Sequence, residues 1–242
     1  MEAIFKKEFR SYFYSPIGYV FIAIFFFVAS LFFSINNLFG GSGDINMVFS
    51  NMTLIFLFLT PVITMRLLAE EKNAKTDQLL FTAPVKVSSI VLGKFFAAMS
   101  IFALAMALTV VYPLLLASFT KPDWGKMISN YVGFMFMGAA FVSIGLYISS
   151  LTENQIIAAV STFGVLFLLY LIDVFGNAVS TVSLFGLDIK LGQVISAVSL
   201  IAKFKDFSMG IIDIGAIVFY IGVVVIFVYL TVFHIEKKRW SK

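Results

Sequence analysis

Six apolar runs, each of about 20 residues or more, recur along this chain of 242 residues. Each is long enough to cross the hydrocarbon core of a bilayer as a helix. Charged residues make up 12% of the chain, about half of what a soluble domain carries. The sequence therefore predicts an all-α polytopic membrane protein with six transmembrane helices. The predicted spans cover residues 17–39, 47–65, 91–118, 128–150, 155–177 and 211–233.

Two of these runs have features that shape the bundle. The third run is too long to cross a bilayer without tilt, and Pro113 is placed where a kink would shorten it. In the fourth run, Gly145 and Ser149 lie one helical turn apart, a spacing typical of close helix packing in membranes. Residues 17–242 are expected to form a single domain.

The distribution of basic residues predicts the orientation of the chain. With six spans, both termini and the loop at 66–90 share one side of the membrane. Basic residues concentrate on the cytoplasmic side of membrane proteins, so both termini are expected to be cytoplasmic. That side receives Lys6, Lys7, Arg10, Arg66, Lys72, Lys75, Lys86, Lys94, Lys237, Lys238, Arg239 and Lys242, and the other receives Lys121, Lys126, Lys190, Lys203 and Lys205.

Residues 1–16 predict an amphipathic helix that lies along the membrane surface. Phe5, Phe9 and Tyr12 fall on one arc, Arg10 lies opposite, and Glu8 intrudes on the apolar arc. Pro16 ends the segment, because the residue before a proline avoids the helical region. Cations on such a helix lie near anionic head groups. A charged tail that only sets topology is the alternative.

Residues 178–210, between the fifth and sixth spans, predict an external re-entrant segment. The segment is apolar but too interrupted to span, so it is expected to dip into the outer leaflet or to lie on it. Asp173 and Asp213 flank it near the outer surface. They are either interfacial and structural, or they form an outer gate at the exit of a substrate path.

The residue types present argue against catalysis by this chain. One His and no Cys leave the usual nucleophile–base and zinc arrangements without their parts. No G-x-x-x-x-G-K-[ST] phosphate loop occurs. No cofactor is expected in this chain, and nucleic acid is not an expected partner. Energy for any transport must come from a partner protein or from an ion gradient.

The loop at 66–90 has the pattern of a docking surface. A solvated, mixed-charge helical surface is predicted for Glu70, Glu71, Lys72, Lys75 and Asp77, in which Glu71 and Lys75 form a supportive i,i+4 pair. The apolar residues Leu79, Leu80 and Phe81 follow it, just before Pro84. Apolar side chains rimmed by charge are typical of a protein interface. A simple return of these apolar residues to the membrane surface stays open as the alternative.

The stretch MRLLAEEKNAKTDQLLFTAPVKVSSIVLGK resembles the corresponding loop of type-2 ABC exporter permeases. Lys75 departs from the family pattern, which has glycine there, and so does Asp77-Gln78. IFKKEFRSYFYSPIGYVF and FKDFSMGIIDIGAIVFY look like the gliding-motility-type branch. The loop matches at Arg66, Leu67, Ala69, Glu70, Glu71, Lys72, Thr76, Leu79, Leu80, Thr82, Pro84, Val85, Gly93 and Lys94.

The resemblance implies a membrane permease subunit of an ATP-driven exporter in a bacterial inner membrane. It implies two separate ABC ATPase subunits, which bind ATP and Mg, and a second permease subunit, identical or a sister. The gliding-type branch adds an accessory membrane protein with an external domain. The elbow helix would be residues 1–16, with Phe5, Phe9, Arg10 and Tyr12. Docking on the ATPase would involve Arg66, Glu70, Glu71, Lys72, Asp77, Leu79, Leu80, Phe81 and Pro84.

A carrier or channel that works without ATP is the alternative function. It would be driven by a gradient and would depend on Asp173 or Asp213, the carboxylates nearest the spans. The residues do not identify the substrate, and they do not distinguish a permease homodimer from a heterodimer.

Overall fold

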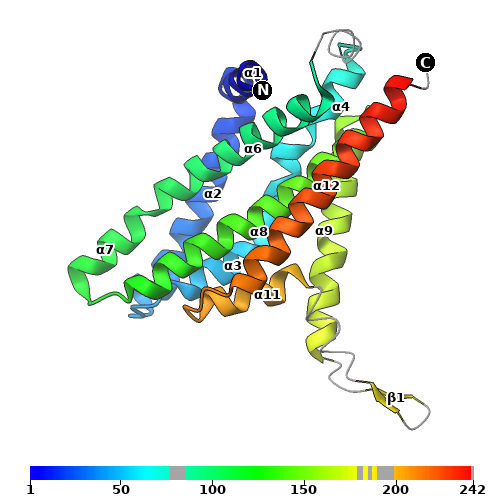
Figure 1. The fold of residues 1–242 in the computed structure, drawn as a ribbon. Coiled ribbons are helices and arrows are strands. Elements are labelled where there is room, and N and C mark those ends of the chain that lie inside the picture. The colour runs from blue at the N-terminus through cyan, green and yellow to red at the C-terminus, as the bar shows by residue number, and fades with distance from the viewer. Residues whose placement is uncertain (77–84, 179–181, 185–186, 190–198, 241–242) are drawn as a thin grey trace.

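The computed structural model describes residues 1–76, 85–178, 182–184, 187–189 and 199–240 (Figure 1). Six helices in this part of the chain are long and apolar enough to cross a membrane, which confirms the predicted all-α, six-helix membrane architecture. The candidate spans run Pro16–Phe39, Asn46–Asn73, Val87–Phe119, Trp124–Leu151, Gln155–Phe175 and Ile214–Arg239. The described helices are α1 Glu2–Tyr14, α2 Pro16–Phe33, the π-helix η1 Ser34–Phe39, α3 Asn46–Thr64, α4 Arg66–Asn73, α6 Val87–Thr109, α7 Val111–Phe119, α8 Trp124–Leu151, α9 Gln155–Ala178, α11 Leu200–Ser208 and α12 Ile214–Trp240.

The third span breaks between α6 and α7 at Val110, three residues before Pro113. Proline lacks a backbone N–H, and its ring crowds the carbonyl four residues earlier, here that of Thr109. The helix therefore ends at Thr109, and the Val110 N–H donates to the carbonyl of Ala107 instead, at 3.2 Å. The helix is thus interrupted three residues before Pro113, the position predicted for a kink.

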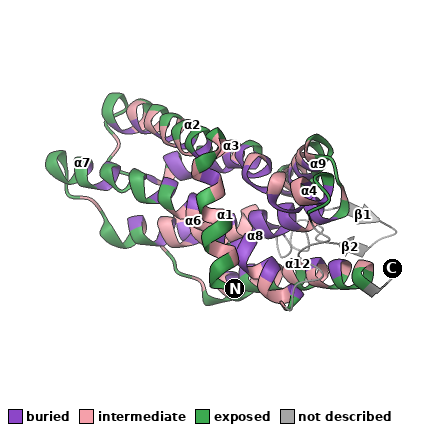
Figure 2. Cartoon of the chain, turned by 90° about the horizontal axis from the view of Figure 1, so that it is seen from above, coloured by how far each residue is buried: buried purple, intermediate pink, exposed green. Residues whose placement is uncertain are grey.

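Helices α3 and α8 form the centre of the bundle, and they are mostly buried in Figure 2. Small residues on α8 allow this packing. A Cβ atom added at Gly145 would lie 2.4 Å from Thr64 Oγ1 on α3, and one at Gly138 would lie 2.2 Å from the ring of Phe102 on α6. Neither position tolerates a side chain without movement of its neighbour. Glycine at these two positions therefore sets how closely the helices approach.

Helix α1 lies across one end of the bundle. It is seen nearly end-on in Figure 1 and lengthwise in Figure 2, whereas the spans run between the two ends. Helix α4 and the end of α12 lie at this same end (Figure 1). We call it the α4 end. Both termini are thus on one side of the molecule, as an even number of spans requires.

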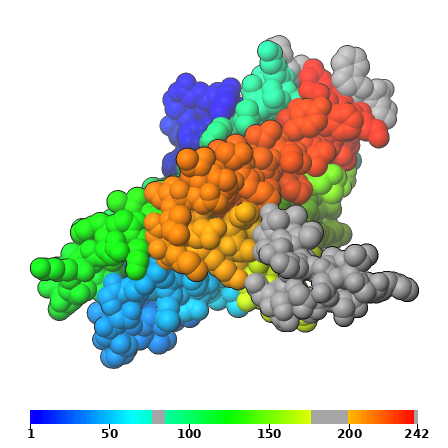
Figure 3. Space-filling model, turned by 60° about the horizontal axis from the view of Figure 1, so that its bottom comes forward, coloured from blue at the N-terminus to red at the C-terminus, as the bar shows by residue number. Residues whose placement is uncertain are grey.

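The opposite end carries the segment between α9 and α12. It includes a short antiparallel pair, β1 Val182–Leu184 and β2 Leu187–Ile189, in which Val182 is opposite Ile189. Helix α11 and the start of α12 occupy the centre of the surface in Figure 3. Phe204 and Phe207 of α11 are buried, and Phe207 packs against the backbone of α8 at Gly133. Residues 190–198 of the predicted re-entrant segment lie outside the described residues, and its dip into the leaflet stays a prediction.

Candidate functional site

The α4 end is organised around a bend between α3 and α4 at Met65. Ser149, on α8, places its hydroxyl oxygen in the bend. It accepts from the backbone N–H groups of Leu68 and Ala69, both at 3.2 Å, and donates to the carbonyl of Met65 at 3.0 Å. A side chain inserted into the ladder of backbone hydrogen bonds is a recognised cause of a helix bend. Ser149 therefore both fixes α4 to α8 and sets the direction in which α4 leaves the bundle.

The next residue of α8 holds α4 a second time. The Lys72 ammonium, almost fully buried, donates to the backbone carbonyl of Ser150 in the last turn of α8. Carbonyls in the last turn of a helix lack partners within the helix and carry partial negative charge, which a lysine compensates. Two consecutive serines of α8 thus hold α4 through polar contacts.

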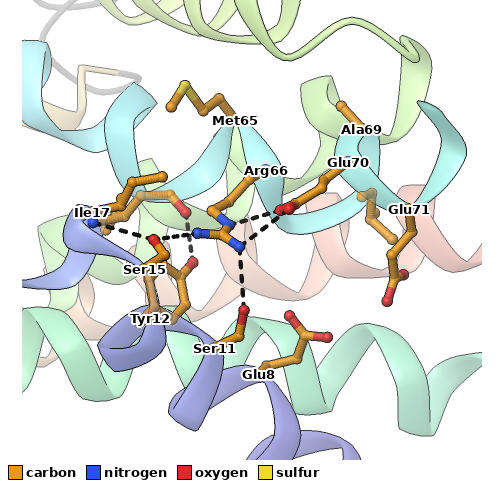
Figure 4. A network of polar contacts seen from close by, with 12 residues as sticks. Glu8, Ser11, Tyr12, Ser15, Ile17, Met65, Arg66, Ala69, Glu70 and Glu71 are labelled. Atoms are coloured by element: carbon orange, nitrogen blue, oxygen red, sulfur yellow. Dashed lines mark hydrogen bonds and ion pairs between the residues drawn. The ribbon is translucent and has the colours of Figure 1, made fainter. Parts of the chain in front are cut away.

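Arg66, in the first turn of α4, connects this helix to the end of α1 (Figure 4). Its guanidinium forms two hydrogen bonds with Glu70, at 2.8 and 3.2 Å. The same group donates to the hydroxyls of Ser15 at 2.6 Å and Ser11 at 3.2 Å. It also lies over the ring of Tyr12, 6.0 Å from the centroid. A planar guanidinium suits such a fork of acceptors better than an ammonium does.

Tyr12 joins α1 to the same bend. Its hydroxyl donates to the carbonyl of Ile63 at 2.6 Å, and the side chain is buried. Burial raises the pKa of the Tyr12 hydroxyl, so this group stays protonated and remains a donor. The bend at Met65 is therefore contacted by α8 from one side and by α1 from another.

Glu71 faces away from solvent, toward two lysines. One carboxylate oxygen lies 3.1 Å from Lys7 Nζ on α1, and the other lies 2.9 Å from Lys94 Nζ on α6. Burial acts to lower the pKa of Lys7, but the charges and hydrogen bonds of Glu71 and Glu8 outweigh it and raise the pKa above its usual value. Lys7 therefore stays charged over the whole physiological range.

The prediction that α4 presents a solvated surface is wrong for two of its residues. Glu71 and Lys72 point inward, because α1, α6 and α8 supply charged and carbonyl partners for them. Glu70 is 43% exposed while it pairs with Arg66, and Asn73 to Thr76 are exposed. The other predicted docking residues, Asp77, Leu79, Leu80, Phe81 and Pro84, lie outside the described residues.

Helix α4 ends in a Schellman motif whose key position is Lys75. The Lys75 N–H donates to the carbonyl of Lys72 at 3.1 Å, and the Thr76 N–H donates to that of Glu71 at 3.0 Å. Lys75 has a φ of +56°, in the left-handed region where glycine is usual. The turn in which the sequence departs from the family glycine is therefore formed, with a lysine in a strained backbone conformation.

Replacement of Lys75 by glycine is expected to stabilise the protein by about 1 kcal/mol, because the left-handed conformation costs roughly this much for a residue with a Cβ. The measurement is the free energy of unfolding in detergent. Ala74→Gly is the control: Ala74 has a φ of −76°, so the added freedom should destabilise it by about 0.5 kcal/mol or more. If the two substitutions changed the free energy of unfolding by the same amount, the strain assigned to the left-handed conformation of Lys75 would be contradicted.

The predicted elbow residues lie on α1 as the amphipathic pattern indicates. Phe5 and Phe9 stack with ring centroids 5.8 Å apart on the half-buried face, next to Tyr12. Arg10 is exposed on the other face. There it lines a groove of about 490 Å³ together with Ala3, Lys6, Lys7, Ser11 and Tyr14.

Asp173 and Asp213, the two predicted gate carboxylates, accept hydrogen bonds in different parts of the structure. Asp173, on α9, is buried and accepts from the Ser199 hydroxyl at 2.7 Å, and Lys205 Nζ lies 3.9 Å away. Asp213 precedes α12 and accepts from the N–H groups of Gly215 and Ala216, at 2.9 and 3.0 Å. Asp173 thus ties α9 to α11, and Asp213 caps the start of α12.

Sequence reasoning did not single out Ser149 and Ser150 as partners of α4, nor Lys94 and Glu8 as partners of each other. The signal for Ser149 was its spacing from Gly145. The signal for the second pair was a carboxylate on the apolar arc of residues 1–16 and a lysine at the start of the third apolar run.

The polar side chains described at the α4 end make contacts between helices. These contacts are ion pairs and hydrogen bonds. Among the described residues, no group of three or more His, Asp and Glu could hold a metal ion. The family model of the ABC-2 family transporter protein matches residues 2–233. Among curated proteins, none matches the chain.

Proposed function

The chain belongs to the ABC-2 transporter family, and on this ground we propose that it is an exporter permease driven by a separate ATPase that docks on α4 and the segment after it. Family membership makes it a multi-pass membrane subunit for transport. The docking site, the direction of transport and the ATPase coupling are the proposal. ATP and Mg would be bound by that partner.

The observation that carries the proposal is the attachment of α4. Helix α4 has eight residues and lies outside the central bundle. If it were connected to the protein only at its ends, a force applied to it would move the other helices little. Here α4 is bonded to α8 through Ser149, to α1 through Arg66, and to α6 through Glu71. A force applied to α4 therefore reaches three other helices without passing through a flexible link.

We propose that both termini and α4 are cytoplasmic, in a bacterial inner membrane. The excess of basic residues at the α4 end supports this orientation. In it, α1 would be the elbow helix: its exposed cations, Lys6 and Arg10, would lie at the level of the head groups. Residues 1–16 would then be the interfacial element, and residues 17–242 the permease domain.

We also propose the composition of the complex: two ATPase subunits and a second permease, identical or a sister. The gliding-type pattern at both ends of the chain favours an accessory membrane protein with an external domain. At the opposite end, Asp173 would act as part of an outer gate through its contact with α11, and Asp213 through the start of α12. Neither role needs the carboxylate at the bilayer midplane.

The test is the isolation of the affinity-tagged chain from its native membrane. It should carry an ATP-hydrolysing subunit. Reversal of Glu71 or Lys72 would be ambiguous, because these residues also hold α4 within the permease. Lys75 is exposed in the turn that follows α4. Lys75→Glu therefore changes the charge of the docking surface, leaves the backbone bonds of the turn in place and should lower the bound ATPase about tenfold, the equivalent of one lost charge contact.

Lys121→Glu is the matched control, because Lys121 is exposed at the opposite end of the bundle. It should leave the bound ATPase unchanged. The proposal fails if the purified chain alone transports a substrate into vesicles under a gradient, with loss of transport in Asp173→Asn or Asp213→Asn. It also fails if Lys75→Glu and Lys121→Glu reduce ATPase binding equally.

A further inference from the structure

Lys94 is the point at which three helices distant in sequence meet. It lies in α6, and its side chain is only 1% exposed. Its Nζ is 3.1 Å from Glu8 Oε1 on α1 and 2.9 Å from Glu71 Oε2 on α4. The Glu8 carboxylate that interrupts the apolar arc of α1 thus has a defined partner, as does the lysine at the start of the third apolar run.

Lys7 completes this arrangement from the solvent side. Its Nζ lies 3.1 Å from Glu71 Oε1 and 3.5 Å from Glu8 Oε1, and its side chain is 63% exposed. We call Lys7, Glu8, Glu71 and Lys94 the four-charge cluster. Two cations alternate with two carboxylates, so the cluster has no net charge as long as all four members are present.

The close contact of α1 and α6 depends on the residue next to Lys94. A Cβ atom added at Gly93 would lie 3.0 Å from Ile4 Cγ2 on α1. Glycine therefore lets α1 rest against the backbone of α6, one residue from the ammonium that Glu8 contacts. Packing and charge pairing act at the same place.

Stability alone does not account for such a cluster. The desolvation of buried charges offsets most of their attraction, and a well-packed apolar replacement is often as stable. The cluster does make its members depend on one another. Once one charge is removed, the others are left unbalanced, and the carboxylates of Glu8 and Glu71, each only 12% exposed, have little water to compensate. An element of this kind makes the positions of three helices depend on one another.

We propose that the four-charge cluster makes α1, α4 and the start of α6 move as one body, with Lys94 as its positioning residue. This inference rests on the proposed function, in which the ATPase displaces α4. The span that begins at Val87 continues to Phe119, so a displacement of α4 would reach the opposite end of the bundle through α6 and then α7. The contact of Ser149 with α4 would carry the same displacement to α8.

The test uses the absence of cysteine in this chain. Cysteines placed at the exposed positions Ala3 on α1 and Ala74 after α4 can carry spin labels without further changes. The distance distribution between them is measured in nanodiscs. Lys94→Met should lengthen and broaden this distribution, because Glu8 and Glu71 would then face each other with only the exposed Lys7 to compensate.

Two further variants make this result specific. Lys86→Met removes an exposed lysine just before α6 and should leave the distribution unchanged. Glu8→Gln combined with Lys94→Met leaves Lys7 and Glu71 as a neutral pair and should restore most of the short distance. If Lys94→Met does not accumulate, Glu8→Gln alone should loosen α1 from α6. An unchanged distribution in both Lys94→Met and Glu8→Gln would overturn the proposal.

The coupling role is tested in the complex with the ATPase, trapped with ATP and vanadate. In the native complex the distance between spin labels at positions 3 and 74 should stay constant. The distance from the label at Ala74 to a second label at Glu236 on α12 should change. In Lys94→Met the first distance should change, and the stimulation of ATP hydrolysis by the permease should fall about tenfold, a usual size for coupling between sites.

The two proposals fail in different ways. If no ATPase binds the chain, the proposed function is wrong and the coupling role falls with it, whereas the distance change in the isolated permease still reports on the cluster. If the ATPase binds but α1 and α4 move independently in the native complex, the function stands and the inference is overturned.

Discussion

Replacement of Gly145 by valine is expected to lower the free energy of unfolding by about 3 kcal/mol, because an overpacked core costs this much when its neighbours cannot move away. A Cβ atom at this position would lie 2.4 Å from Thr64 Oγ1 and 2.7 Å from Thr64 Cβ. Thr64 is itself fully buried, and its hydroxyl donates to the carbonyl of Thr60 at 2.9 Å. Neither α3 nor α8 can make room for the valine unless its backbone moves.

Gly164→Val on α9 is the matched control. A Cβ atom there would meet nothing within 4 Å, so the same substitution in another span should change the unfolding free energy by less than about 0.5 kcal/mol. Unfolding in detergent by a denaturing surfactant measures both. A loss of equal size in the two variants would mean that valine at position 145 does not act through contact with Thr64.

Gly145 also shows which parts of the fold follow from the sequence. Hydropathy depends only on local composition, so the sequence predicts six apolar spans, and six described helices are long and apolar enough to cross a membrane. Their ends are predicted less well: the last candidate span runs to Arg239, whereas the sequence predicts an end at residue 233. The break near Pro113 follows from the covalent structure of proline, which acts over a fixed distance along the chain. The spacing of Gly145 and Ser149 predicts close packing, but not the helix that packs there.

The site is predicted less completely, because its contacts join residues far apart in the chain. Glu71 and Lys72 are predicted to lie on a solvated surface, because charges of both signs alternate within their own segment and could pair there. Their partners Lys94 and Ser150 come from other helices, and only the folded bundle brings them near. In the same way, Glu8 looks out of place on the apolar arc of α1 until Lys94 is seen beside it.

Lys75 stands where the family pattern has glycine, and it shows a second reason why the sequence predicts the site incompletely. The pattern predicts a left-handed turn there, and the lysine in its place leaves that turn in doubt. The structure keeps the turn, because the Schellman hydrogen bonds from Lys75 and Thr76 satisfy two carbonyls of α4. The gain from these bonds outweighs the strain at a single residue.

Ser149→Ala is expected to destabilise the protein by about 2 kcal/mol and to change the direction of α4. The Leu68 and Ala69 N–H groups would lose their acceptor, and each unpaired buried donor costs about 1 kcal/mol or more. They can regain partners only if α3 and α4 straighten, so that each N–H donates to the carbonyl four residues earlier. Straightening would move α4 away from the end of α8 and weaken the contact of Lys72 with Ser150.

Ser143→Ala, on the same helix, separates this effect from the loss of any buried hydroxyl. Ser143 is fully buried, but its hydroxyl donates to the carbonyl of Ala140 within α8, at 2.7 Å. It should therefore cost no more than about 1 kcal/mol and leave α4 in place. The measurement pairs unfolding with hydrogen exchange at Leu68 and Ala69, which should speed up only in Ser149→Ala. Unaltered exchange at these two amides would show that Ser149 does not hold the bend. The described hydrogen bond that still joins α4 to α8 would then be that of Lys72 with Ser150.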